Sequence, residues 1–195
     1  MKKLLITGFE PFGGEKINPS WEAVLRLPDK IGEYSIEKLL LPVVFGRAAE
    51  AVIRTAGKSE PDIILAIGQA GGRDRITPEL VAINLRYAAI ADNSGLSPCD
   101  EPILKGAEDA HFSTLPVRKM ASAIADCGIP AKLSYSAGAY VCNDTLFLLL
   151  EHFKNTKTRV GFIHIPYCNE QNKTPSLPLD SITKALAIAI ESIDA

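Results

Sequence analysis

The sequence predicts an α/β protein in which a single domain, residues 1–195, forms an α/β/α sandwich around a mainly parallel, twisted central sheet. Three observations favour this fold class. Short apolar runs alternate with amphipathic stretches along the whole chain. No repeat, low-complexity tract or linker divides it. Its 195 residues are 47% hydrophobic and 23% charged, which is typical of a globular domain with a sizeable core.

The first half of the chain contains the clearest strand and helix patterns. The strands are short apolar runs bounded by turn residues, at 2–7, 34–41 and 63–67. The helices are amphipathic, at 19–27 and 46–57. Asn18-Pro19 marks the start of the first helix, because asparagine is a favoured N-cap and proline suits the first helical position.

The second half begins with strand character over 79–90, followed by a polar loop over 91–113 that is long for a compact domain. Loops of this length tend to be functional or to lie at subunit contacts. Strands are then predicted at 131–136 and 159–165, and helices at 115–126, 142–153 and 179–193. Alternation of strands with helices favours parallel pairing, so sites are expected just after the strands, at the carboxyl edge of the sheet.

Composition excludes several classes of partner. The net charge of -2 gives no sign of the basic surface that binding to nucleic acid requires, so nucleic acid is not an expected partner. No segment approaches the roughly 18–20 apolar residues that span a bilayer. The apolar run at the N-terminus stops at Gly8-Phe9-Glu10, unlike a signal peptide, so we expect a cytoplasmic protein. In that compartment the four widely spaced cysteines are expected to be free thiols: Cys99, Cys127, Cys142 and Cys168.

The common cofactor patterns are absent. The glycine-rich turn 8–14 lacks the lysine and hydroxyl of a P-loop, and its Glu10 would repel a phosphate. The turn 68–73 does not fit a dinucleotide fingerprint, although Arg73 leaves an anion site open. Neither the histidines nor the cysteines have the spacing of a zinc site. We therefore expect no metal and no cofactor.

Cys142 is the candidate nucleophile. It follows a stretch of small residues and opens a predicted helix. A thiol at a helix N-terminus lies near unpaired N–H groups and the positive end of the helix dipole, which lowers its pKa. The same amides can bind an oxyanion. From position alone, a buried structural cysteine is favoured over a nucleophile, and Cys99 and Cys168 are weaker rivals for the nucleophile.

A thiol nucleophile needs a histidine as its base, and a third group to orient the imidazole. His164 ends an apolar strand at the predicted carboxyl edge. His152 lies in the helix that begins at Cys142, roughly 15 Å along it, and is excluded. His111, in the polar loop, remains an alternative. Glu79 is the best acidic candidate, because apolar residues follow it directly, although an exposed turn carboxylate would look the same.

Several of these segments together resemble one family of cysteine peptidases, pyroglutamyl peptidase I, also called pyrrolidone carboxyl peptidase. The resemblance covers nearly the whole chain. Its segments, in the order of the family's motifs, are GFEPFGG at 8–14 with Asn18-Pro19, GQAGGR at 68–73, TPELVAIN at 77–84, FSTLP at 112–116, AGAYVCN at 137–143 and GFIHIP at 161–166.

The resemblance implies a catalytic triad of Cys142, His164 and Glu79, no metal or cofactor, and a cytoplasmic homo-oligomer, a tetramer or dimer. The implied substrates are peptides with an N-terminal pyroglutamyl residue, which is released as free pyroglutamate. Phe9 and Phe12 would enclose the flat lactam ring. The other implied substrate-binding groups are the Gln69 side chain and main-chain groups near Phe12, Val44 and Val141.

The chain departs from the family in one segment. Where the family usually has Ala-Arg-Ile-Pro-Asp-Asn, residues 88–93 read AAIADN, so Ala89 replaces an arginine that lies near the active site in relatives. Arg86 or Arg73 could compensate, or activity could be reduced. Two alternatives therefore stay open: a catalytically weakened binding protein for small cyclic amides, and a nucleoside-type hydrolase or phosphorylase that uses Arg73 for an anion.

Overall fold

The computed structural model describes residues 1–195, and its centre is a six-stranded sheet in the order β2-β3-β1-β4-β8-β5. The four inner strands run parallel to one another, and the two short edge strands are antiparallel to their neighbours. The bounds are Lys2–Phe9 (β1), Lys30–Ile31 (β2), Tyr34–Leu41 (β3), Ile63–Gln69 (β4), Thr77–Pro78 (β5) and Arg159–Ile165 (β8). The predicted mainly parallel central sheet is confirmed.

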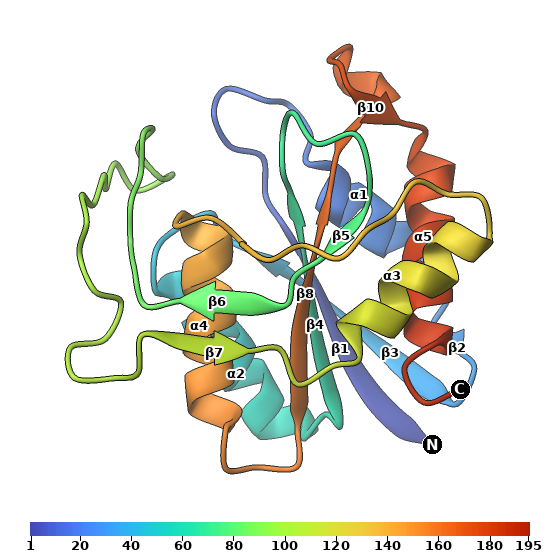
Figure 1. Cartoon of the computed structure of the whole chain (residues 1–195), viewed down its shortest axis with the longest axis horizontal. Coiled ribbons are helices and arrows are strands. Elements are labelled where there is room, and N and C mark those ends of the chain that lie inside the picture. The colour runs from blue at the N-terminus through green and yellow to red at the C-terminus, as the bar shows by residue number, and fades with distance from the viewer.

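Helices cover both faces of this sheet (Figure 1). One face carries α1 (Pro19–Arg26), α3 (Val117–Asp126) and α5 (Leu179–Glu191), and the other carries α2 (Arg47–Ser59) and α4 (Val141–Phe153). The predicted cap of the first helix is present, because Asn18 Oδ1 accepts a hydrogen bond from the Ser20 N–H at 3.1 Å. None of these helices combines the length and the apolar character that a membrane crossing requires.

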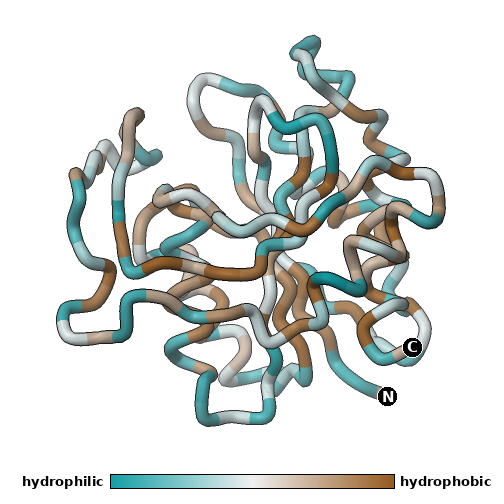
Figure 2. The backbone as a smooth tube through the Cα atoms, in the orientation of Figure 1, coloured by the Kyte–Doolittle hydropathy of each residue, from teal (hydrophilic) through white to brown (hydrophobic).

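Alternation along the strands divides the apolar residues between two cores. Leu4 and Ile6 of β1 face α1, α3 and α5, whereas Leu5 and Phe9 face α2 and α4. Strands buried on both faces are hydrophobic throughout, and Figure 2 shows brown, hydrophobic backbone along the strands at the centre of the molecule. This division decides on which side of the sheet each later residue lies.

Two smaller strand pairs lie outside the sheet. β6 (Val81–Ile83) pairs antiparallel with β7 (Ala110–Phe112) and packs on α4. β9 (Tyr167–Cys168) pairs with β10 (Ser176–Leu177), and the 3-10 turn η1 (Asn169–Gln171) lies between them. Strand structure over 79–90 is thus limited to β6, and the predicted loop 91–113 ends in β7.

The strand predicted at 131–136 is wrong. This segment forms only single bridges, Ile76 to Ala131 and Glu79 to Ser134. Its partner is the region of β5, where Pro78 has no N–H to donate, so a regular ladder cannot continue. The segment therefore follows the edge of the sheet without becoming a strand.

The topology places a crevice beside β1. From β1 the chain passes to β3 on one side, and the next strand of the sheet in sequence, β4, lies on the other side. Connections that leave neighbouring parallel strands in opposite directions open a crevice at their carboxyl ends, where ligands bind in such folds. Those ends are Phe9 of β1 and Gln69 of β4.

Candidate active site

Cys142 lies in the first turn of α4, as predicted. Gly138, with φ of +79°, allows the chain to turn sharply before the helix. The first backbone hydrogen bond of α4 runs from the Asp144 N–H to the Tyr140 carbonyl at 3.0 Å. The amides that precede Asp144 in the helix donate to no group of the chain and are available to an oxyanion beside the sulfur.

His164 and Cys142 lie on the same side of the sheet, both next to Gly68. His164 pairs with Gly68 across β8 and β4, so the two residues face the same side. Cys142 packs from α4 on this side: a Cβ built on Gly68 would lie 2.9 Å from its Sγ. The ring of Phe162 is 2.7 Å from the same point. Because Gly68 has no side chain, the Cys142 thiol can pack against β4 at the position that pairs with His164.

Glu79 orients His164. It follows β5, the edge strand that pairs with β8, and its Oε1 is 2.7 Å from His164 Nδ1. Both side chains are buried. A carboxylate only accepts, so Nδ1 carries the proton and Nε2 is left as a free base.

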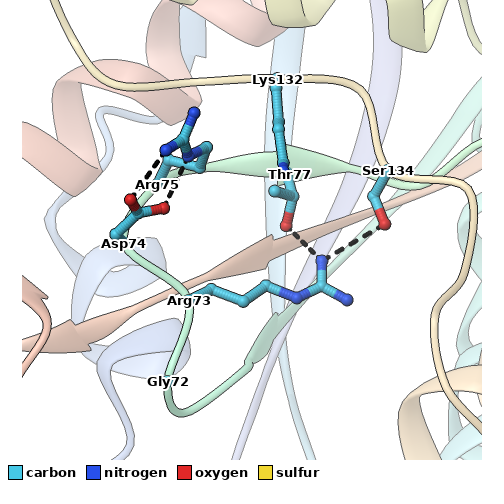
Figure 3. Close-up of a pocket in the computed structure, with 7 residues that line it drawn as sticks. All are labelled: Gly72, Arg73, Asp74, Arg75, Thr77, Lys132 and Ser134. Carbon is cyan, nitrogen blue, oxygen red and sulfur yellow. Dashed lines mark hydrogen bonds and ion pairs between the residues drawn. The ribbon is translucent and has the colours of Figure 1, made fainter.

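Arg73 is a second partner of the same carboxylate oxygen. Its NH1 lies 2.5 Å from Glu79 Oε1 and also donates to Thr77 Oγ1 at 2.5 Å. The Thr77 hydroxyl in turn donates to the His164 carbonyl at 3.2 Å. Figure 3 shows the guanidinium reaching from the 68–73 turn to Thr77 and Ser134. Its surroundings form a polar cavity to which Arg75 and Lys132 also contribute.

The electrostatics favour a neutral imidazole beside an ionised acid. Burial lowers the pKa of His164, although the hydrogen bond and charge of Glu79 oppose this. Burial by itself would raise the pKa of Glu79, but the hydrogen bond and charge of His164 and the charge of Arg73 bring it below its ordinary value. At neutral pH the site therefore contains a base that can take a proton from a neighbouring group.

The expected low pKa of Cys142 is wrong. Burial raises the pKa of this thiol to about 12, and the Glu79 carboxylate adds to the rise, whereas Arg73 opposes it. Loss of hydration thus outweighs the helix dipole, whose typical effect is about 0.3–1 kcal/mol, or less than one pKa unit. Burial thus favours a neutral thiol beside a neutral imidazole in the free site.

A small cavity opens directly in front of the thiol, at the crevice between β1 and β4. Its lining is mainly apolar and contains no charged side chain. The lining residues are Phe9, Phe12, Asn18, Val43, Gln69, Tyr140, Val141 and Cys142. Four of the five expected substrate-binding residues, Phe9, Phe12, Gln69 and Val141, thus lie here. Val44 does not line the cavity; its neighbour Val43 does.

Three lining residues were missed by the sequence reasoning. Asn18 and Val43 come from connections whose path depends on the sheet, and nothing in the pattern of Val43 distinguishes it from Val44. Tyr140 had a local signal, because it stands two residues before Cys142. Its ring packs on Phe12 with a centroid distance of 6.2 Å, and its hydroxyl donates to the Ala91 carbonyl at 3.2 Å.

The two proposed substitutes for the missing arginine differ. Arg73 contacts Glu79, whereas Arg86 Nε binds Asp144 Oδ1 at 2.5 Å, away from the cavity. Ala89 itself is exposed. Asn93, which matches the family pattern, donates from Nδ2 to Glu10 Oε1 at 2.8 Å and so joins this segment to the loop that carries Phe12.

The remaining histidine and cysteine candidates lie elsewhere. His111 is on β7, where its Nε2 is 2.7 Å from Glu151 Oε2 and its ring packs on Phe147. Cys99 is exposed, and Cys168 is buried in the core on the α1, α3 and α5 side. Neither cysteine has a histidine–carboxylate pair of the kind that His164 and Glu79 form.

Comparison with known proteins identifies the family. The family model for pyroglutamyl peptidase matches residues 2–195. A pyrrolidone-carboxylate peptidase from Thermococcus onnurineus is 46% identical over 97% of this chain and 98% of its own. One from Thermosipho africanus is 48% identical over 98% of this chain and 96% of its own.

Solved structures give the same result. Pyroglutamyl peptidase I from Bacillus amyloliquefaciens superposes with a TM-score of 0.95 at 46% identity, over 100% of this chain and 96% of that chain. Pyrrolidone carboxyl peptidase from Thermococcus litoralis gives a TM-score of 0.94 at 40% identity, over 100% and 94%. The chain belongs to the pyroglutamyl peptidase family.

Proposed function

We propose that this chain is a cysteine peptidase that hydrolyses the amide bond after an N-terminal pyroglutamyl residue and releases free pyroglutamate. The observation that carries the proposal is the small uncharged cavity that ends at Cys142, beside the buried pair of His164 and Glu79. A nucleophile, a base and an orienting acid converge there on the carboxyl edge of the sheet. Residues 1–195 form the one peptidase unit in this proposal.

Acylation begins with the lactam ring between Phe9 and Phe12 and the substrate α-carbonyl at Cys142. The sulfur attacks the carbonyl carbon while its proton passes to His164 Nε2, and the first amides of α4 hold the oxyanion. The imidazolium then gives this proton to the leaving nitrogen, and the C–N bond breaks. Glu79 stabilises the imidazolium and holds its tautomer.

Deacylation uses the same base. His164 takes a proton from water, the hydroxide attacks the thioester carbonyl, and the C–S bond breaks as the proton returns to the sulfur. The products are pyroglutamate and the neutral thiol of Cys142. The enzyme therefore returns to a neutral thiol and a neutral imidazole, the forms that burial favours in the free site.

Selectivity follows from the lining of the cavity. A free N-terminal ammonium would be buried without a counter-charge, which is costly, whereas the lactam is neutral. The lactam carbonyl needs a donor, because an unpaired buried polar group costs about 1–3 kcal/mol. The N–H groups of Phe12 and Val44 donate to no group of the chain, but of these two residues only Phe12 lines the cavity. The Phe12 N–H and the Gln69 side chain are therefore the lining donors that the lactam carbonyl could meet.

The decisive experiment is hydrolysis of a pyroglutamyl anilide by the wild type and by Cys142→Ala, with Cys168→Ala as the matched control. We expect turnover in the wild type and the control, and none in Cys142→Ala. Iodoacetamide labelling at Cys142 should abolish turnover. Activity that survives in Cys142→Ala rejects the mechanism, and binding of 2-pyrrolidone without any turnover favours the binding-protein alternative. Dependence on phosphate would favour the nucleoside alternative.

The proposal includes a homo-oligomer, a tetramer or dimer, acting in the cytoplasm. The support is apolar surface beside the site: Phe112 of β7 is 68% exposed and Tyr135 is 65% exposed. Light scattering on the purified chain measures the subunit number directly. A monomer at micromolar concentration contradicts this part of the proposal without affecting the peptidase mechanism.

A further inference from the structure

A hydrogen-bonded chain of side chains runs behind the cavity, from the η1 turn to Gln69. Gln171, the last residue of η1, contacts Cys168 of β9, Glu15 of the N-terminal loop and Gln69 at the end of β4. These contacts link segments that are 102 and 156 residues apart in the sequence. Gln69 lines the cavity in front of Cys142, so the chain of contacts ends at the wall of this cavity.

The two ends of this network determine the direction of every amide in it. The Cys168 N–H can only donate, and it donates to Gln171 Oε1 at 3.2 Å. The Glu15 carboxylate only accepts, and Gln171 Nε2 lies 3.1 Å from its Oε2. Gln171 therefore presents its NH₂ group to Gln69, whose Oε1 accepts at 2.9 Å.

In this arrangement Gln69 Nε2 is the last donor of the network and has no acceptor within the chain. The one side-chain hydrogen bond of Gln69 is the one that its Oε1 accepts, so Nε2 donates to no group of the chain. Turning the Gln69 amide over would place its NH₂ group against that of Gln171 and would break the network. Gln69 is thus held with a donor, and not an acceptor, available to a ligand.

We propose that Gln171 is a specificity-determining positioning residue, which holds the Gln69 side chain so that its Nε2–H donates to the ring carbonyl of the lactam. The inference rests on the proposed function and names the group that recognises the feature distinguishing a pyroglutamyl ring from a prolyl ring. The prolyl ring has a methylene where the lactam has its carbonyl, so it cannot accept this hydrogen bond.

Two substitutions of Gln171 separate this role from a merely structural one. Gln171→Met removes both amide groups and leaves Gln69 free to rotate. Gln171→Glu, made together with Glu15→Gln to keep the local charge, retains an acceptor for the Cys168 N–H. Its carboxylate would accept from Gln69 Nε2, so the amide would turn over and present its carbonyl to the lactam carbonyl.

We expect the inhibition constant of 2-pyrrolidone and the KM for a pyroglutamyl anilide to rise about 10-fold in Gln171→Met and about 100-fold in the Gln171→Glu pair. The value of kcat should change less than about 3-fold, because the reacting atoms are not touched. Glu170→Gln alters a neighbour in η1 outside the network and should behave as the wild type does. Glu15→Gln alone measures how much the loss of that carboxylate contributes to the double variant. Melting temperatures of all variants check the fold.

The order of the two variants decides the outcome. A merely structural role predicts that Gln171→Met, which loses the hydrogen bond to Cys168, raises KM more than the Gln171→Glu pair does. That result, or an unchanged KM in both variants, overturns the inference. Turnover by the wild type keeps the proposed function intact in either case. Side-chain amide NMR adds a readout that needs no turnover. Addition of 2-pyrrolidone should shift the Gln69 NH₂ signals in the wild type, and an unshifted signal at saturation overturns the inference.

Discussion

Arg73→Met should impair the site without touching the nucleophile. The buried Glu79 has two partners, His164 and Arg73, both on Oε1, while its Oε2 has none. At 2.5 Å and an effective dielectric constant of about 20, the attraction between Arg73 and Glu79 is about 6–7 kcal/mol before desolvation is subtracted. Removing one partner of a buried pair typically costs about 3–5 kcal/mol.

The position of Arg73 favours the lower end of that range. Its side chain is 28% exposed, so water screens part of the interaction. A loss of about 3 kcal/mol corresponds to a melting temperature lower by roughly 6–12 °C for a chain of this size. Misalignment of His164 should reduce kcat/KM by about 10²-fold.

The pH profile gives a readout that stability alone does not. The charge of Arg73 lowers the pKa of His164 as well as that of Glu79. Without Arg73 both pKa values rise, and His164 is active only when it is unprotonated. The acidic limb of kcat/KM should therefore move to higher pH.

Two further variants control this experiment. Arg75→Met removes an arginine that lines the same polar cavity but pairs with the exposed Asp74, at 2.6 Å, and it should leave the pH profile unchanged (Figure 3). Arg73→Met combined with Glu79→Gln removes both charges and should recover stability but not activity. An unshifted acidic limb in Arg73→Met, with the fold intact, would refute this account of Arg73.

Three other predictions concern the thiol and its surroundings. Gly68→Ala should reduce kcat by at least about 10²-fold, because the new Cβ would lie 2.9 Å from the Cys142 sulfur; unchanged kinetics would contradict the packing. Alkylation of Cys142 by iodoacetamide, mapped by mass spectrometry, should quicken steadily from pH 7 to pH 10, because burial raises its pKa to about 12; a plateau near neutral pH would indicate a thiolate–imidazolium pair instead. Arg86→Met should lower the melting temperature by leaving the buried Asp144 carboxylate without its ion-pair partner, with KM unchanged; a raised KM would place Arg86 in substrate binding.

Local pattern was a good guide where neighbouring residues decide the outcome. The cap at Asn18, the first buried strand, which was predicted over 2–7 and extends to Phe9, and the helix predicted from Cys142, which begins one residue earlier, all depend on contacts within a few residues. The prediction failed at 131–136, because strand formation there depends on a partner 55 residues away, where Pro78 cannot donate. β-structure is decided by its partner as much as by its own residues.

The pKa of Cys142 shows the same limit. The sequence predicts that Cys142 lies at a helix N-terminus, and this position favours the thiolate. Desolvation depends on what packs over the sulfur, here the sheet at Gly68 and the ring of Phe162, and it is the larger effect.

The sequence by itself determined the α/β class, the order of the main elements, the motifs that resemble the family, and the residue types able to do the chemistry. Only the tertiary structure decided which of them meet: that Cys142 and His164 share one face of the sheet across Gly68, that Val43 and not Val44 lines the cavity, and that Gln171 reaches Gln69. The reason is physical. Periodicity reports the environment of each element, whereas contacts between residues distant in sequence depend on strand register and on how two layers of helices pack on the sheet.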